Sequence, residues 1–156
     1  MTPPVLDIRV DDLTGEPTRQ LLALHLAGMH QNSPPGQVFA LDLSGLQTPT
    51  VTVWSAWRQA ALAGIAALKV HDDGTGELKS MRTHPSHLRQ GVASALLEHL
   101  VGQARRRGLR RLSLETGSGP AFEAALALYR TRGFRDGEPF ADYRRSEFNR
   151  FLHLDL

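Results

Sequence analysis

The sequence predicts an α/β (α+β) fold: a single domain over residues 1–156, in which about four helices cover a mixed sheet of about seven strands. Segments in which apolar and polar residues alternate, as in strands, are interspersed with segments whose apolar residues recur at helical spacing. Glycine and proline fall between these segments, where turns are needed. No repeat or low-complexity linker divides the chain, and its length suits one domain with a hydrophobic core.

The first half of the chain predicts strands on both sides of a helix. Apolar and polar residues alternate over 5–10, which indicates a strand. Leucines on one face predict a helix over 17–30, and 37–49 fits a short helix or a turn. β-Branched and aromatic residues predict a strand over 51–57, and the apolar run 61–70 predicts its buried neighbour.

The second half alternates between strands and helices. A strand over 77–83 is predicted to stop before Pro85. Apolar spacing predicts a helix over 91–107, followed by a strand over 110–115 and a helix over 120–132. Two more strands are predicted near 138–143 and 149–155.

Composition excludes several classes of protein. The chain is 41% hydrophobic and 22% charged, and its apolar runs are too short to cross a membrane. Its first residues lack the basic and apolar stretches of a secretory signal, so a cytoplasmic protein without a membrane partner is expected. The absence of cysteine removes disulfides, thiolate metal sites and cysteine nucleophiles.

The basic stretch RRRGLRR, residues 105–111, has two interpretations. It fits a solvated last helical turn, where cations favour the negative end of the helix dipole. It also fits contact with an anion or a nucleic acid. The net charge of +2 is small and no aromatic platform accompanies the arginines, so no nucleic-acid partner is predicted.

The stretch HPSHLRQGVASALLEHL, residues 84–100, places Gly91 at the point where a helix begins. The N-terminus of a helix offers unpaired N–H groups and a partial positive charge, which suit a phosphate. A glycine lets the backbone approach phosphate oxygens closely. An ordinary helix start explains the same residues, so both interpretations remain open at this point.

The wider context, ELKSMRTHPSHLRQGVASALLEHLVGQARRRGLRRLSLE followed by ALYRTRGF, resembles the GNAT superfamily of acyl-CoA-dependent N-acyltransferases. Gly91-Val92-Ala93 matches the second half of that family's Arg/Gln-x-x-Gly-x-Gly/Ala signature, although Leu88 occupies its first position. The resemblance implies a mostly antiparallel sheet and an acyl-CoA donor, here acetyl-CoA.

The resemblance also implies which residues hold the donor. The backbone of Met81, Arg82 and Thr83 would bond the pantetheine arm, and Ala125 and Tyr129 on the last helix would line it. The amides that would meet the pyrophosphate belong to Arg89, Gln90, Gly91, Val92, Ala93 and Ser94. The Arg89 side chain is equally well explained as a surface charge.

Catalytic roles follow from the same resemblance. Tyr129 matches the general acid that protonates the departing thiolate, whereas helical spacing alone would make it a core aromatic. Glu77 matches a general base, or is an exposed acid after a turn. Glu115, at a strand end, is the rival base and a predicted acceptor contact, together with Trp57. His84 and His87 lack a third ligand nearby, so no metal is predicted.

The predicted function is an acetyl-CoA-dependent N-acetyltransferase that acts on a primary amine of a small molecule, amino acid or peptide by direct attack in a ternary complex. The alternative is a non-catalytic acyl-CoA-binding or regulatory domain. Two departures from the family favour it: Leu88, and Phe122, which stands seven residues before Tyr129 where many relatives carry an asparagine. Relatives often dimerise through late strands, so a homodimer is expected.

Overall fold

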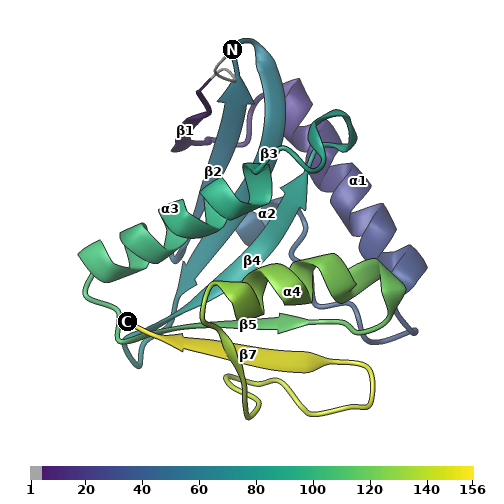
Figure 1. Cartoon of the computed structure of the whole chain (residues 1–156), viewed down its shortest axis with the longest axis vertical. Helices are drawn as coiled ribbons and strands as arrows, with labels where there is room; N and C mark the ends of the chain where they lie inside the picture. The colour runs from purple at the N-terminus through teal and green to yellow at the C-terminus, as the bar shows by residue number, and fades with distance from the viewer. Residues whose placement is uncertain (1–4) are drawn as a thin grey trace.

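The computed structural model describes residues 5–156, which build one seven-stranded sheet in the order β1-β2-β3-β4-β5-β7-β6. Neighbouring strands are antiparallel except β4 and β5, which are parallel (Figure 1). The strands are β1 Asp7–Val10, β2 Val51–Arg58, β3 Ala61–Val70, β4 Thr75–Thr83, β5 Arg111–Thr116, β6 Arg135–Asp136 and β7 Arg150–Asp155.

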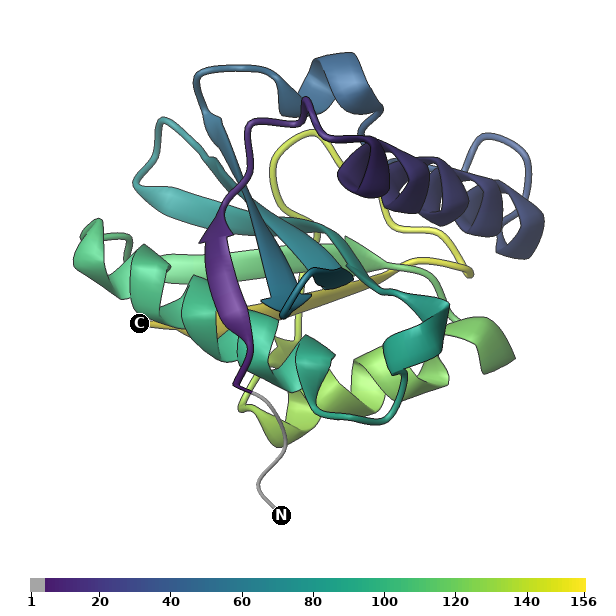
Figure 2. The same cartoon turned by 90° about the horizontal axis from the view of Figure 1, so that it is seen from above.

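Helices lie on both faces of the sheet: α1 and α2 on one side, α3 and α4 on the other (Figure 2). Each face has its own core. Leu96 and Leu100 of α3 pack with β-strand residues such as Leu112, whereas Leu21 of α1 packs with Ile65 on the opposite face. The helices are α1 Glu16–Asn32, α2 Leu43–Leu46, α3 Val92–Arg106 and α4 Glu123–Thr131, with short 3-10 turns at Pro85–His87 and Pro120–Phe122.

Most predicted elements are confirmed, and the ambiguous segment 37–49 contains the short helix α2, which the Asp42 carboxylate caps. The strand predicted near 138–143 is wrong. Only Arg135–Asp136 pairs with β7 there, and the chain then forms a loop up to β7. Pro139 lacks a ladder donor, and the aromatic rings of Phe140 and Tyr143 pack against Phe151 instead of continuing a strand.

Two irregularities in β4 open the sheet. The parallel pairing with β5 covers only Thr75 to Glu77, so the two strands part beyond that residue. On the β3 side the register shifts between Ile65 and Ala67, and Ser80 has a φ of 53°, as expected for a β-bulge. Such strained backbone in a non-glycine residue is frequent at functional sites.

No helix within residues 5–156 is long and apolar enough to cross a membrane.

Candidate active site

A loop with left-handed backbone leads into α3. Gly91 is the N-cap of the helix with a φ of 82°, and Arg89 also has a positive φ, 59°. Arg58, at the end of β2, donates from Nη2 to the Gln90 carbonyl at 2.9 Å and from Nη1 to the Gln90 side chain. The sheet therefore holds this loop in place.

The start of α3 fits an anionic group. No side chain from the described residues 5–156 caps the helix, and the N–H groups of a first turn have no acceptor within the helix. A Cβ placed on Gly91 would meet nothing within 4 Å, so the backbone lies in open space. The predicted pyrophosphate residues, from Arg89 to Ser94, thus lie together at the N-terminus of a helix, a geometry that suits a phosphate group.

We expect Gly91→Ala to lower the free energy of unfolding by about 1 to 2 kcal/mol, because a Cβ strains the left-handed conformation. Since no atom lies near the new methyl group, a clash adds nothing. Gly102→Ala is the matched control: Gly102 lies inside α3 with open space around it, so alanine should add about 0.5 to 1 kcal/mol of stability. Urea unfolding measures both. Equal stability of Gly91→Ala and the wild type would contradict the left-handed backbone at Gly91.

A cavity of about 160 Å³ lies where β4 and β5 part. Elements from both faces of the sheet line it, since α4 contributes Ala125 and Tyr129 while α1 contributes His25. A cavity lined from both faces of the sheet is suited to two reactants that approach from opposite sides. Of the predicted site residues, Glu77, Met81, Arg82, Glu115, Ala125 and Tyr129 line the cavity.

The Tyr129 side chain is buried, and its hydroxyl group has no nitrogen or oxygen partner within residues 5–156. Its hydrogen-bond contact there is the Met81 sulfur at 4.0 Å. Burial raises the pKa of Tyr129 to about 12, so the phenol keeps its proton at neutral pH. Because buried tyrosine hydroxyls usually have a polar partner, this one is suited to a ligand atom.

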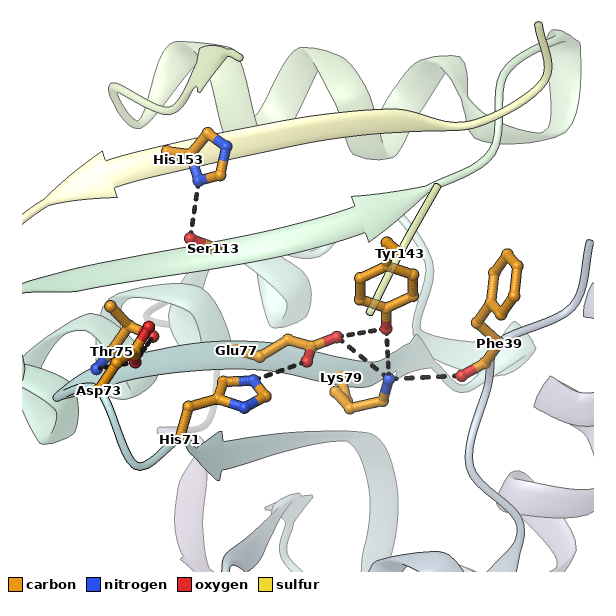
Figure 3. A network of polar contacts seen from close by, with 9 residues as sticks. All are labelled: Phe39, His71, Asp73, Thr75, Glu77, Lys79, Ser113, Tyr143 and His153. Atoms are coloured by element: carbon orange, nitrogen blue, oxygen red, sulfur yellow. Dashed lines mark hydrogen bonds and ion pairs between the residues drawn. The ribbon is translucent and has the colours of Figure 1, made fainter. Parts of the chain in front are cut away.

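Glu77 is only 3% exposed, and its carboxylate accepts three hydrogen bonds (Figure 3). Oε2 accepts from the Tyr143 hydroxyl at 2.5 Å and from Lys79 Nζ at 3.1 Å, and Oε1 lies 3.0 Å from His71 Nε2. Lys79 also donates to the Phe39 carbonyl at 3.3 Å. Glu77 is thus neither exposed nor free, since every oxygen already has a partner.

Glu115 is the other carboxyl group in the cavity, and no hydrogen bond or ion pair of its side chain is found among residues 5–156. Burial raises the pKa of Glu115 to about 7, with a smaller contribution from the negative charge of Glu77, while Lys79 opposes the shift. A carboxyl group with a pKa near neutrality is well matched to proton transfer at physiological pH.

The bulge of β4 also faces the cavity. Ser80 is buried, and its hydroxyl oxygen has no partner within the described chain. Two residues later, Arg82 donates from Nε to His25 Nδ1 at 3.1 Å and from Nη2 to the His25 carbonyl at 3.3 Å. These contacts join β4 to α1 beside the cavity.

Other predicted residues lie outside the cavity lining. Trp57 packs against the α1-side core, where Arg9 lies over its ring at 4.7 Å, and Thr83 ends β4 beyond the cavity. Three arginines of the stretch 105–111 contact other residues; these are Arg107 with Thr52, Arg110 with Asp73 and Arg111 with Asp155. Arg105 and Arg106 lie in the last turn of α3, as the helix-dipole interpretation predicts.

Sequence reasoning did not assign a role to Lys79, Ser80, Tyr143 or His25. Tyr143 lies 66 positions after Glu77, so no local spacing connects them. The sequence did contain one indication of this cluster. In the stretch ELK, residues 77–79, Lys79 lies two positions after Glu77 and therefore on the same face of the strand.

Metal ligands do not gather in the described part of the chain. Residues 5–156 contain no group of three or more histidine, aspartate or glutamate side chains that could hold a metal ion. His84 Nδ1 accepts instead from the Ser86 N–H at 3.0 Å.

Comparisons with known proteins agree with the geometry. The model of the Acetyltransferase (GNAT) family matches residues 18–134. A protein of Escherichia coli (strain K12), the uncharacterized N-acetyltransferase YedL, is 54% identical over 149 residues, which are 96% of this chain and 94% of that protein. A Klebsiella pneumoniae structure, described as that of an acyl-CoA N-acyltransferase, has a TM-score of 0.79 at 27% identity and covers 97% of this chain and 98% of its own.

The fold is shared more widely. A Bacillus subtilis acetyltransferase in complex with CoA has a TM-score of 0.74 at 21% identity, with 97% of this chain and 99% of that chain covered. The family model covers most of the described residues, including β4, the loop before α3, and Tyr129. This chain therefore belongs to the GNAT acetyltransferase family and is an N-acetyltransferase.

Proposed function

We propose that this protein transfers the acetyl group of acetyl-CoA to a primary amine of a small molecule, amino acid or peptide, by direct attack in a ternary complex. The observation that carries the proposal is the buried Tyr129 hydroxyl, which has no nitrogen or oxygen partner within residues 5–156, in a cavity where two sheet strands part. The N–H groups at the start of α3 suit the diphosphate of the donor, and they follow β4 on the chain after the short turn Pro85–His87.

The donor lies, in this proposal, between the loop around Gly91 and Tyr129. The backbone from Met81 to Thr83 is free on its β5 side and can bond the pantetheine arm as an added strand would. The extra residue of the bulge at Ser80 leaves backbone groups unpaired. N–H groups there polarise the thioester carbonyl and stabilise the oxyanion that forms on attack.

Proton transfers complete the reaction. Glu115 accepts a proton from the acceptor ammonium, and the neutral amine forms a bond to the carbonyl carbon. The carbon–sulfur bond then breaks, and the thiolate takes the phenolic proton of Tyr129. The remaining ammonium proton of the product nitrogen restores the phenol, so one proton per turnover leaves through Glu115. Burial raises the pKa of a thiol as it does that of a phenol, so a thiolate that leaves inside the cavity is a stronger base towards Tyr129 than a thiolate in water.

Glu115 is preferred to Glu77 as the base because its carboxyl group has no partner in the described part of the chain and its pKa is about 7. Glu77 already accepts from Tyr143 and Lys79 and would have to break these bonds before taking a proton. The role of Glu77 as the base remains the alternative prediction, and comparison of Glu77→Gln with Glu115→Gln separates the two.

The test is release of free thiol from acetyl-CoA in the presence of amines, amino acids and peptides, combined with calorimetric titration of CoA. We expect CoA to bind and thiol to appear only with an accepted amine. Binding of CoA without thiol release for any acceptor would favour the non-catalytic alternative, and no binding at millimolar CoA would refute both. Light scattering of the same samples tests the expected homodimer.

A further inference from the structure

Arg82 carries an uncompensated charge at the edge of the cavity. Two cationic side chains line this cavity, and one of them, Lys79, pairs with Glu77 at 3.1 Å. The other, Arg82, forms no ion pair with any residue in 5–156, and its Nη1 has no hydrogen-bond partner there. It is half-buried, and burial lowers the pKa of its guanidinium group.

The contacts of Arg82 orient the guanidinium group without neutralising it. Nε donates to His25 Nδ1, and burial together with the charge of Arg82 lowers the pKa of His25 to about 4. The imidazole is therefore neutral at pH 7. A Cβ on Gly28 of α1 would lie 2.5 Å from Arg82 Nη2, so this glycine leaves the room that the guanidinium group occupies.

The side chain of Arg82 lies on the side of the sheet opposite the predicted acid. The preceding residue, Met81, contacts Tyr129 of α4 through its sulfur atom. Successive side chains of a strand point to opposite faces, and Arg82 accordingly reaches His25 on α1. If the donor occupies the α4 side, as the proposed function requires, Arg82 belongs to the acceptor side.

We propose that Arg82 binds a carboxylate of the acceptor, and that the acceptor is therefore an amine bearing a carboxylate, as amino acids are. This inference rests on the proposed function and deepens it. A guanidinium group matches a carboxylate with two parallel hydrogen bonds, and a partly buried cation is stabilised when such a partner arrives. Glu115 lines the same cavity and faces the amine, so the two ends of the acceptor meet groups of opposite charge.

A purely structural role for Arg82, in which it only ties α1 to β4, makes a different prediction. Loss of a structural tie weakens turnover of every amine alike. Loss of a carboxylate contact weakens only acceptors that carry the carboxylate. The discriminating quantity is the ratio of kcat/KM for an amino acid to kcat/KM for the matched amine that lacks the carboxylate.

The experiment measures thiol release with α- and ω-amino acids, each paired with its decarboxylated amine and, for α-amino acids, with its carboxamide. We expect at least one amino acid to exceed its partners by 10-fold or more in the wild type. In Arg82→Gln this ratio should fall about 10-fold or more, to near one, mainly through a higher KM for the amino acid, with partial recovery in Arg82→Lys. Arg105→Gln, an exposed arginine at the end of α3, is the matched control and should keep the ratio.

Each result bears on one of the two proposals. If CoA does not bind and no thiol is released, the proposed function fails. If CoA binds but amines and carboxamides react as well as amino acids, the carboxylate inference is wrong while the proposed function stands. The same conclusion follows if Arg82→Gln lowers kcat/KM equally for all acceptors. If CoA binds and no acceptor reacts, the carboxylate inference is tested by calorimetric titration of the CoA complex with the same amino acids. The inference is overturned if no amino acid binds in a way that depends on Arg82.

Discussion

Tyr129→Phe should lower kcat by about 10²- to 10⁴-fold, the range expected for loss of a general acid. The phenylalanine ring keeps the packing against Phe134, whose centroid lies 5.9 Å away, and removes only the hydroxyl group. Because that hydroxyl has no nitrogen or oxygen partner within residues 5–156, the variant leaves no protein group unpaired. We therefore expect the thermal unfolding temperature and the CoA affinity to stay close to those of the wild type.

Steady-state kinetics and calorimetry with CoA check this result together. Tyr143→Phe is the comparison variant, since it removes the other tyrosine hydroxyl of the chain, which donates to Glu77 rather than facing the thiolate. A rise in KM alone, with a kcat equal to that of the wild type, would show that Tyr129 is only a core aromatic residue.

Glu115→Gln should also lower kcat by about 10²- to 10⁴-fold and should change the pH profile. A base with a pKa of about 7 is ionised above neutrality, so the wild-type rate should rise about tenfold per pH unit below 7 and level off above it. Glutamine cannot take the proton, so the rise of the rate with pH below 7 should disappear in this variant. Glu77→Gln, measured beside it, should keep this rise.

The same variant has a stability signature. The pKa of Glu115 rises from an unfolded value near 4.5 to about 7 in the folded protein, so ionisation opposes folding. Wild-type stability is therefore highest below pH 4.5 as far as this group is concerned, and falls as pH rises through 7. Glu115→Gln should unfold at a higher temperature than the wild type at pH 8. Lower stability together with lower activity would instead mean that Glu115 supports the structure.

Sequence periodicity located most of the secondary structure because local apolar spacing and turn residues determine it. The helix predicted over 91–107 is α3, and the strand predicted over 61–70 is β3. The strand predicted near 138–143 was wrong because of contacts made in the tertiary structure. Its aromatic residues satisfy a strand pattern, but Phe140 and Tyr143 are half-buried against Phe151, and Tyr143 also donates to Glu77 on another strand.

The residues of the candidate site fall into two groups: those that local motifs predict, and those whose environment depends on long-range contacts. Gly91 and Tyr129 were recognised because their neighbours along the chain form motifs. The environments of Glu77, Glu115 and Arg82 could not be read from the sequence, because they depend on contacts between elements far apart in the chain. Arg82 meets His25 across 57 positions, and Tyr143 meets Glu77 across 66.

The sequence by itself determined the order of strands and helices, the helix that begins at an unhindered glycine, and the family, because these depend on residues close together along the chain. Only the tertiary structure decided which carboxyl group of the cavity has no bonded partner, and which cation has no ion-pair partner, among residues 5–156. Burial and long-range pairing set the charge state of a side chain, and both arise only when β4 has parted from β5 and the helices have packed on the two faces of the sheet.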